Sequence, residues 1–229
     1  MPRDPVDLPG AEISAIRPDP RNPEVLRIMV GRRIGARVHA VRAAELGLDA
    51  GREIDDALAR TLEAETLRLD AKRRALSWLS RRSLSSGALA QKLRRLGVDT
   101  DAIEELTTEL QAAGLINDPV YAKALAEARA DGARGARRIE IDLRRRGLGR
   151  DLSRHAAEDA TKDRDEREDA LVLARKRANR PSFAKLERAA AERRLSGFLQ
   201  RRGFSADACR EAVRRALREL HEQDHDQQF

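Results

Sequence analysis

Aromatic side chains and cysteine are scarce in this sequence. One Trp, one Tyr and four Phe make up 3% of the 229 residues, and Cys209 is the single cysteine. The shortage of rings disfavours a module that holds single-stranded nucleic acid by stacking its bases on exposed aromatic side chains. A lone cysteine cannot form an internal disulfide, so the sequence fits a reducing compartment, and we expect Cys209 to be a small apolar member of the core.

Long apolar runs and recognisable catalytic motifs are also lacking. No stretch approaches the ~20 apolar residues of a membrane span, and the N-terminus has no apolar signal core, which together predict a cytoplasmic protein without a membrane segment. The sequence has no Gly-rich phosphate loop, no closely spaced cysteine pair and no Gly-x-Ser-x-Gly elbow. His221 and His225 have a spacing that suits two metal ligands on one helix face, but no third ligand is evident. We therefore expect a binding protein without metal or cofactor, and not an enzyme.

Basic residues outnumber acidic ones, and nearly all of them are arginine. The chain has 46 basic and 39 acidic residues, a formal net charge of +7, and only six of the basic residues are Lys. The first 70 residues hold 11 basic and 13 acidic side chains, and the remainder holds 35 and 26. A basic body favours a polyanionic partner, either nucleic acid or an acidic protein surface. A GC-rich genome would also enrich Arg and Ala, so the excess of arginine alone does not establish a polyanionic partner.

The first part of the chain predicts a small strand-rich unit. Residues 1–10 contain three prolines and are expected to form a loose tail. AEISAIRP and VLRIMV predict two strands separated by a turn in DPRNP, and IGARVHAV predicts a third. RAAELGL predicts a short helix that ends at Gly47.

From Asp55 onward the apolar residues follow the helical period. The expected helix boundaries are an N-cap at Ser85, ends at Gly97 and Gly114, an N-cap at Asp118 with Pro119 in the first helical position, and an N-cap at Ser205.

A nine-residue motif occurs three times in this helical part. It reads LRRLGVDTD from Leu93, LRRRGLGRD from Leu143 and LQRRGFSAD from Leu199, and all three copies fit Leu-x-Arg-x-Gly-apolar-x-x-Asp. Helices are predicted before and after each copy. The chain is therefore expected to contain three tandem three-helix repeats.

Each position of the motif has a structural reading. The leucine faces the core, the glycine ends a helix in the left-handed conformation, the apolar residue packs back, and the aspartate suits the dipole of the next helix. Arg95, Arg145 and Arg201 recur at one place near a helix C-terminus. Arginines there compensate the helix dipole or form a basic ridge repeated along the chain, and the sequence leaves both readings open.

Residues 71–218 resemble the RecX family, bacterial regulators of the RecA recombinase. The resemblance is carried by SRRS at 80–83, GLIND at 114–118, ARGARRIEIDLRRRGL at 133–148 and FLQRRGFSAD at 198–207. The strand-containing segment before them resembles an extension that some members carry. The third repeat departs from the pattern, with Pro181 and an alanine-rich stretch before its glycine.

The resemblance implies a mainly α fold of three tandem three-helix repeats in an elongated, curved array, preceded by the small strand-containing unit. It implies a monomeric, non-enzymatic regulator that binds the RecA–DNA filament and inhibits its recombinase, ATPase and co-protease activities, and so acts in recombination, DNA repair and the SOS response. Repeats stacked in one dimension would present an extended surface able to touch several filament subunits.

The expected division is a tail (1–10), an N-terminal extension with a linking helix (11–70), repeats at 71–116, 117–160 and 161–220, and a polar tail (221–229). The predicted contacts with the filament, or with single- or double-stranded DNA in a weak and salt-sensitive complex, are Arg81, Arg82, Lys92, Arg94, Arg95, Arg134, Arg137, Arg138, Arg144, Arg145, Arg146, Arg201 and Arg202. An alternative is an independent DNA-binding protein with a transcriptional role, because short helices joined by Gly-containing turns resemble helix-turn-helix units.

Overall fold

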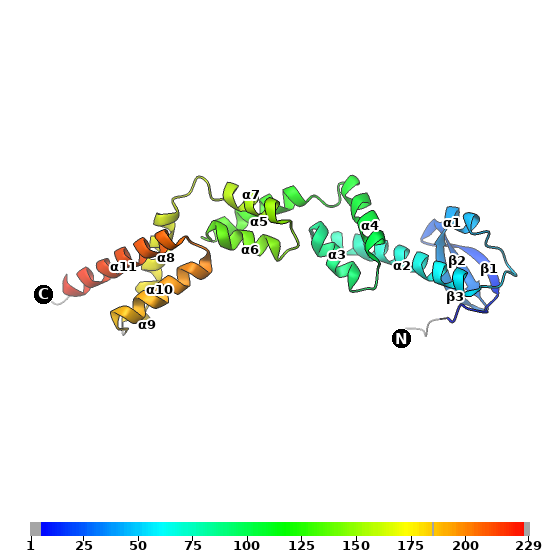
Figure 1. Ribbon diagram of the computed structural model, residues 1–229, viewed down its shortest axis with the longest axis horizontal. Coiled ribbons are helices and arrows are strands. Elements are labelled where there is room, and N and C mark those ends of the chain that lie inside the picture. The colour runs from blue at the N-terminus through cyan, green and yellow to red at the C-terminus, as the bar shows by residue number, and fades with distance from the viewer. Residues whose placement is uncertain (1–5, 185, 227–229) are drawn as a thin grey trace. The chain divides into compact units, whose positions relative to one another are not determined.

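A computed structural model describes residues 6–184 and 186–226, and this part of the chain is mainly helical with one small sheet (Figure 1). It divides into two compact units. The first comprises the chain up to Arg82 together with Leu89–Ala112, and the second comprises Ser83–Ala88 together with the chain from Ala113 onward. No helix in the described ranges is long and apolar enough to cross a membrane.

The first unit begins with an antiparallel sheet in the order β1 (Ile13–Asp19), β2 (Asn22–Val30) and β3 (Arg33–His39). The short helix α1 (Ala40–Glu45) and the start of α2 (Asp56–Leu79) pack with the sheet around a core that includes Ile13, Ile28, Ile54 and Leu62, all 0% exposed. The predicted strand-containing unit is confirmed.

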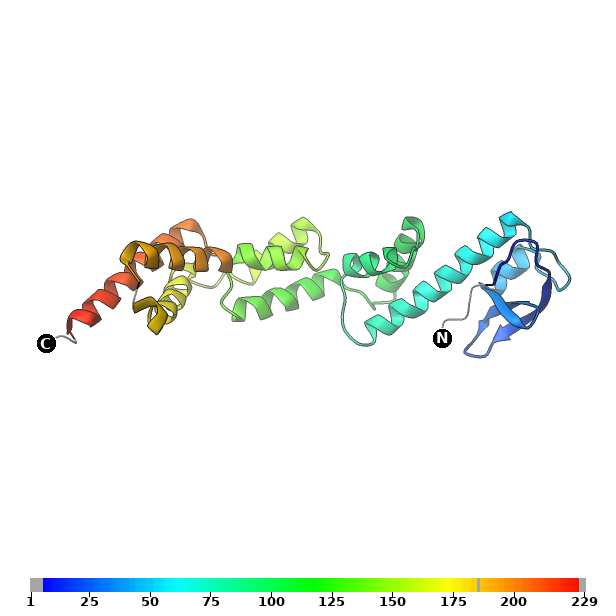
Figure 2. The ribbon, with the colours of Figure 1, turned by 90° about the horizontal axis from the view of Figure 1, so that it is seen from below.

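Helix α2 takes part in two regions of the first unit. It begins at an N-cap, Asp55, whose carboxylate accepts from the N–H of Leu58 at 2.8 Å. Its first half buries Leu62 under the sheet, and its second half buries Ala71 and Ala75. Figure 2 shows α2 as one continuous helix that extends away from the sheet. Residue 70, the expected boundary between extension and first repeat, therefore lies within a single helix.

The remaining helices form the three repeats. After α2, the first repeat is completed by α3 (Ser86–Arg94) and α4 (Thr100–Ala112). The second consists of α5 (Asp118–Asp131), α6 (Ala136–Arg144) and α7 (Arg150–Asp159). The third consists of α8 (Glu166–Ala178), the short α9 (Pro181–Ala184), α10 (Arg188–Arg202) and α11 (Ala206–Asp226). The mainly α architecture with a strand-containing N-terminal unit is thus confirmed.

All three copies of the repeated motif adopt the predicted helix ending. Gly97, Gly147 and Gly203 have left-handed φ angles of 82°, 83° and 89°. The N–H of the apolar residue after each glycine donates to the carbonyl of the motif leucine, at 3.3 Å, 3.4 Å and 3.3 Å, and each leucine is 0% exposed. These bonds satisfy carbonyls that a helix end would leave unpaired, so the motif is first of all a helix stop signal.

Two local expectations differ from the structure. The N-cap of α5 is Asn117, whose side-chain oxygen accepts from the N–H of Val120 at 3.0 Å, and not Asp118. Asp118 occupies the first helical position because its carboxylate accepts instead from the backbone N–H of Ser86 at 2.8 Å and from the Ser86 hydroxyl. Helix α11 continues through the expected polar tail to Asp226, and the side chains of His221 and His225 lie outside the described residues.

Candidate anion-binding interface

Two close backbone contacts inside the second unit position the candidate site, and each involves a motif glycine. The N–H of Gly135, just before α6, donates to the carbonyl of Arg202 at 3.0 Å, and a Cβ on Gly135 would lie 2.3 Å from the carbonyl oxygen of Gly203. Likewise, a Cβ on Gly87 would lie 2.1 Å from the carbonyl oxygen of Gly147. We call these contacts, Gly135–Gly203 and Gly87–Gly147, the two glycine joints.

The third motif glycine shows that the joints are a tertiary feature. Gly97 has the same left-handed conformation, yet a Cβ there would meet nothing within 4 Å. At the Gly87–Gly147 joint the fully buried Ser85 adds a hydroxyl that donates to the carbonyl of Arg146 and accepts from the N–H of Ala88 at 3.1 Å. Gly147 and Gly203 are therefore constrained both by their own backbone conformation and by the neighbouring helix start.

The Gly135–Gly203 joint places a set of arginines around one hollow. The joint brings the beginning of α6 against the end of α10, with α5 alongside. The hollow has a volume of about 440 Å³, and its charged lining consists of Arg129, Arg134, Arg138, Arg201 and Arg202. We call this the basic hollow. A second hollow of about 500 Å³ shares Arg138 and Arg201 and adds Arg137.

One carboxylate accompanies these arginines. Asp142 on α6, whose side chain is 11% exposed, pairs with Arg134, with Arg138 at 3.2 Å and with Arg129 at 3.7 Å. Within the described ranges no other carboxylate pairs with the five arginines of the basic hollow, so Arg201 and Arg202 lack an acidic partner and the five arginines exceed the carboxylate by four positive charges. Such an excess of guanidinium groups suits phosphate or carboxylate ligands, which arginine binds through paired N–H donors.

The thirteen predicted contact residues fall into two groups. Lys92, Arg134, Arg138 and Arg202 have structural partners: Lys92 Nζ lies 4.3 Å from the centre of the Trp78 ring, and Arg202 donates to the Gly132 carbonyl at 3.1 Å and lies over Phe198. The other predicted residues are exposed: Arg81, Arg82, Arg94, Arg95, Arg137, Arg144, Arg145, Arg146 and Arg201.

The structure brings only some of these residues together. Arg134, Arg137, Arg138, Arg201 and Arg202 line the two adjoining hollows. The run Arg144–Arg146 lies at the other end of α6, next to the Gly87–Gly147 joint. Arg129, Asp142 and both helix-start glycines, Gly87 and Gly135, were not predicted from the sequence. The available signal was a glycine ten or twelve residues before a motif glycine, as in Gly87 before Gly97 and Gly135 before Gly147.

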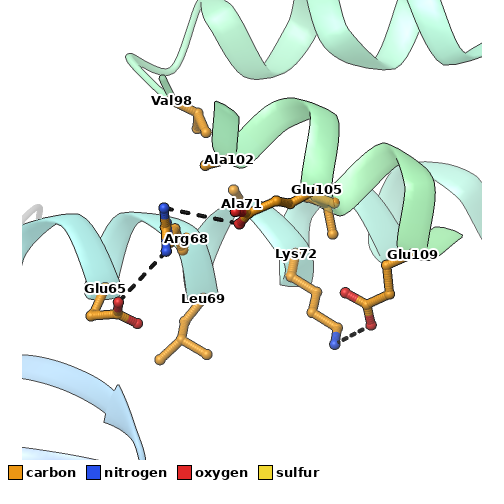
Figure 3. Close-up of a pocket in the computed structure, with 10 residues that line it drawn as sticks. Glu65, Arg68, Leu69, Ala71, Lys72, Val98, Ala102, Glu105 and Glu109 are labelled. Atoms are coloured by element: carbon orange, nitrogen blue, oxygen red, sulfur yellow. Dashed lines mark hydrogen bonds and ion pairs between the residues drawn. The ribbon is translucent and has the colours of Figure 1, made fainter. Parts of the chain in front are cut away.

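The cleft between α2 and α4 has a different character (Figure 3). Arg68 pairs with Glu65 and with Glu105, and Lys72 Nζ lies 2.5 Å from Glu109. With three carboxylates for two cations, this cleft does not attract a polyanion.

Two further groups define the electrostatics away from the hollows. Burial raises the pKa of the Cys209 thiol, which is 2% exposed, so Cys209 is a core residue as expected and not a thiolate nucleophile. The hydrogen bonds from Arg175 lower the pKa of the Glu219 carboxyl and join α8 to α11 at 2.6 Å and 2.7 Å. The described side chains include no cluster of three or more His, Cys, Asp or Glu residues able to hold a metal ion.

These features define a class of protein built from tandem three-helix units, with exposed arginines at contacts between helix ends. Residues 71–110 match the model of the first three-helix domain of RecX, and residues 165–213 match the third. A regulatory protein RecX of Corynebacterium efficiens is 35% identical over 161 residues, which cover 69% of this chain and 76% of the relative. The chain belongs to the RecX family of regulatory proteins.

Further comparisons agree with this assignment. A regulatory protein RecX of Leptothrix cholodnii is 36% identical over 158 residues, which cover 69% of this chain and 94% of the relative. A crystal structure of regulatory protein RecX matches with a TM-score of 0.57 at 23% identity, over 86% of this chain and 96% of that one. RecX from Lactobacillus salivarius matches with a TM-score of 0.53 at 24% identity, over 66% and 96%. These two structures share the fold.

Proposed function

We propose that this chain binds the RecA–DNA filament and inhibits its recombinase, ATPase and co-protease activities, in recombination, DNA repair and the SOS response. The observation that carries the proposal is the basic hollow, which is lined by five arginines, of which three share the carboxylate of Asp142 and two have no acidic partner among the described residues. A filament of protein on nucleic acid offers phosphates and acidic side chains at regular intervals. Repeats that carry arginines at equivalent helix ends suit such a periodic partner, because several weak contacts add up to high avidity.

On this proposal, the thirteen predicted residues divide by role. The nine exposed residues are direct contacts, because they have no acidic partner among the described side chains: Arg81, Arg82, Arg94, Arg95, Arg137, Arg144, Arg145, Arg146 and Arg201. Arg134 and Arg138 hold the walls of the hollow through Asp142, and they contact the anion with their remaining N–H groups. A monomer with repeats at residues 71–116, 117–160 and 161–220, acting in the cytoplasm, completes the proposal.

The test is a titration of this protein into RecA that is hydrolysing ATP on single-stranded DNA. Inhibition when the concentration of this protein is comparable to the concentration of RecA subunits supports the proposal. Unchanged hydrolysis at a large excess of this protein contradicts it.

A second candidate is an independent DNA-binding protein, which the same arginine-lined hollows favour because phosphate is an equally suitable ligand. Binding to labelled duplex DNA, measured with and without RecA, separates the two functions. Tight, sequence-dependent binding to naked duplex that RecA does not strengthen would favour the second function.

A further inference from the structure

A hollow in the first unit lies away from the predicted basic residues. It has a volume of about 840 Å³ and is lined by the turn between β1 and β2, by residues of β2 and β3, and by the second half of α2. We call it the sheet–helix groove. Thr66 is the point where α2 is still bonded to the sheet, because its hydroxyl accepts from the N–H of Arg37 at 2.8 Å. The groove lies beyond this bond, where α2 extends away from the sheet (Figure 2).

The lining of the groove includes three apolar side chains, two of them on α2. Val25 contributes from β2, and Leu69 and Leu76 contribute from α2. Leu76 is 41% exposed, which makes it one of the few large apolar side chains at the surface of the described chain. Because the side chain at position 76 is exposed, a polar residue there would lose no buried contact within the chain. Packing of the first repeat therefore does not explain a leucine at this position.

The charged side chains of the groove are predominantly basic and already hold carboxylates between them. Asp19 pairs with Arg27 at 2.8 Å and with Arg37 at 3.8 Å, and Asp70 pairs with Arg73 at 3.0 Å and with Arg37 at 3.7 Å. Arg37 is therefore shared by two carboxylates, and the three arginines leave one charge in excess.

Two further cations line the groove and differ in availability. The side chain of Arg21 in the β1–β2 turn has no ion pair among the described residues, so its charge is free for a ligand. Lys72 is directed to Glu109 on α4, as Figure 3 shows, and so contributes little positive charge to the groove. The groove thus combines apolar side chains with a net positive charge.

We propose that the sheet–helix groove binds an acidic peptide segment that also carries apolar side chains. The carboxylates of Asp19 and Asp70 show that carboxylate groups fit between these arginines, and an incoming acidic side chain would bind the charge that remains in excess and the unpaired Arg21. Leu69 and Leu76 would bury the apolar side chains of the peptide. Nucleic acid fits less well, because none of the residues lining the groove is aromatic and apolar side chains gain nothing from phosphate.

The test uses fluorescence anisotropy with the full-length protein and three labelled probes. These are a peptide of alternating Glu and Leu, the same peptide with Gln for Glu, and an oligothymidylate of equal length. The variants are Leu76→Glu and Arg73→Glu, each checked by a melting curve. Val172→Glu is the matched control, because Val172 is a comparably exposed apolar residue on α8, in the second unit.

We expect the Glu–Leu peptide to bind the wild-type protein and the Val172→Glu variant equally. Leu76→Glu should weaken binding about tenfold, since a buried leucine contact is lost and a like charge is added. Arg73→Glu should weaken binding to a similar degree, and the Gln-containing peptide should bind less well than the Glu-containing one. Peptide binding that is the same in all four proteins would overturn the proposal. Binding of the oligothymidylate that depends on Leu76 would also overturn it, in favour of a nucleic-acid site.

Discussion

The change Gly87→Ala tests the Gly87–Gly147 joint most sharply. Gly87 lies in the first turn of α3 and has no left-handed φ, so alanine at this position suits the helix and would by itself stabilise it by about 1 kcal/mol. The added Cβ would nevertheless lie 2.1 Å from the carbonyl oxygen of Gly147 and 2.9 Å from its carbonyl carbon. Ordinary contacts between such atoms need about 3.5 Å, so the helix start must move by more than ~1 Å.

That movement breaks specific interactions. The Ser85 hydroxyl loses the carbonyl of Arg146, which costs about 1–3 kcal/mol for a buried polar group, and the overpacked contact costs a further ~1–3 kcal/mol. After subtraction of the helix propensity, we expect a net loss of about 1–5 kcal/mol. Gly97→Ala is the control, because Gly97 has a left-handed φ of 82° and no neighbour within 4 Å, so only the conformational cost of ~1–2 kcal/mol applies.

The assay is urea unfolding followed by circular dichroism. It compares three single variants, Gly87→Ala, Gly97→Ala and Gly147→Ala, with the double variant Gly87→Ala/Gly147→Ala. Gly87→Ala and Gly147→Ala break the same contact. The double variant should therefore lose less stability than the sum of the losses in these two single variants. A Gly87→Ala protein that is more stable than wild type by about 1 kcal/mol, as in an ordinary helix, would refute the joint.

Two further predictions concern charged groups. Asp142→Asn removes the carboxylate shared by Arg129, Arg134 and Arg138. It should destabilise the second unit by about 1–3 kcal/mol, measured by urea unfolding, and strengthen the binding of inorganic phosphate, measured by calorimetry. Unchanged stability would contradict the assigned ion pairs. The hydrogen bond from Arg27 lowers the pKa of Asp19 to about 2. The ionised Asp19 therefore stabilises the fold at pH values above the pKa of Asp19 in the unfolded chain, and this stabilisation is lost as the pH falls from about 4 towards 2. The urea midpoint of the Asp19→Asn variant should fall less over this range than that of wild type, and equal slopes would contradict the assignment.

Local features of this fold were predictable, and contacts between distant segments were not. The three helix endings at Gly97, Gly147 and Gly203 follow from six consecutive residues, so their geometry was readable in the repeated motif. The N-cap at Asn117 could not be predicted from the sequence. The carboxylate of Asp118 accepts a hydrogen bond from Ser86, which lies 32 residues earlier in the chain, and Asn117 caps the helix instead.

The same distinction applies to the candidate site. Exposed arginines next to motif glycines, such as Arg145 and Arg201, could be proposed from the sequence because the motif places them at helix ends. The basic hollow depends on the packing of α5, α6 and α10, which brings Arg129 beside Arg201, 72 positions later in the chain. Only the three-dimensional structure shows that Arg134 and Arg138 share a carboxylate whereas Arg137 and Arg201 do not.

The central claim is that the unpaired arginines beside the glycine joints contact the RecA–DNA filament. Its most direct test is the Arg137→Glu/Arg201→Glu variant, which leaves the structural roles of Arg134, Arg138 and Arg202 intact. Arg60→Glu/Arg74→Glu is the matched control, because these exposed arginines of α2 line neither hollow and the change in net charge is equal.

The measurement is inhibition of DNA-dependent ATP hydrolysis by RecA, titrated at several salt concentrations, with a melting curve for each protein. We predict that Arg137→Glu/Arg201→Glu inhibits more weakly than wild type. Its binding should also depend less on salt, with a slope of log affinity against log salt that is smaller by about 1.4–1.8 if both arginines meet phosphates. The control should match wild type. Equal inhibition and equal salt slopes for a folded Arg137→Glu/Arg201→Glu protein would contradict the account.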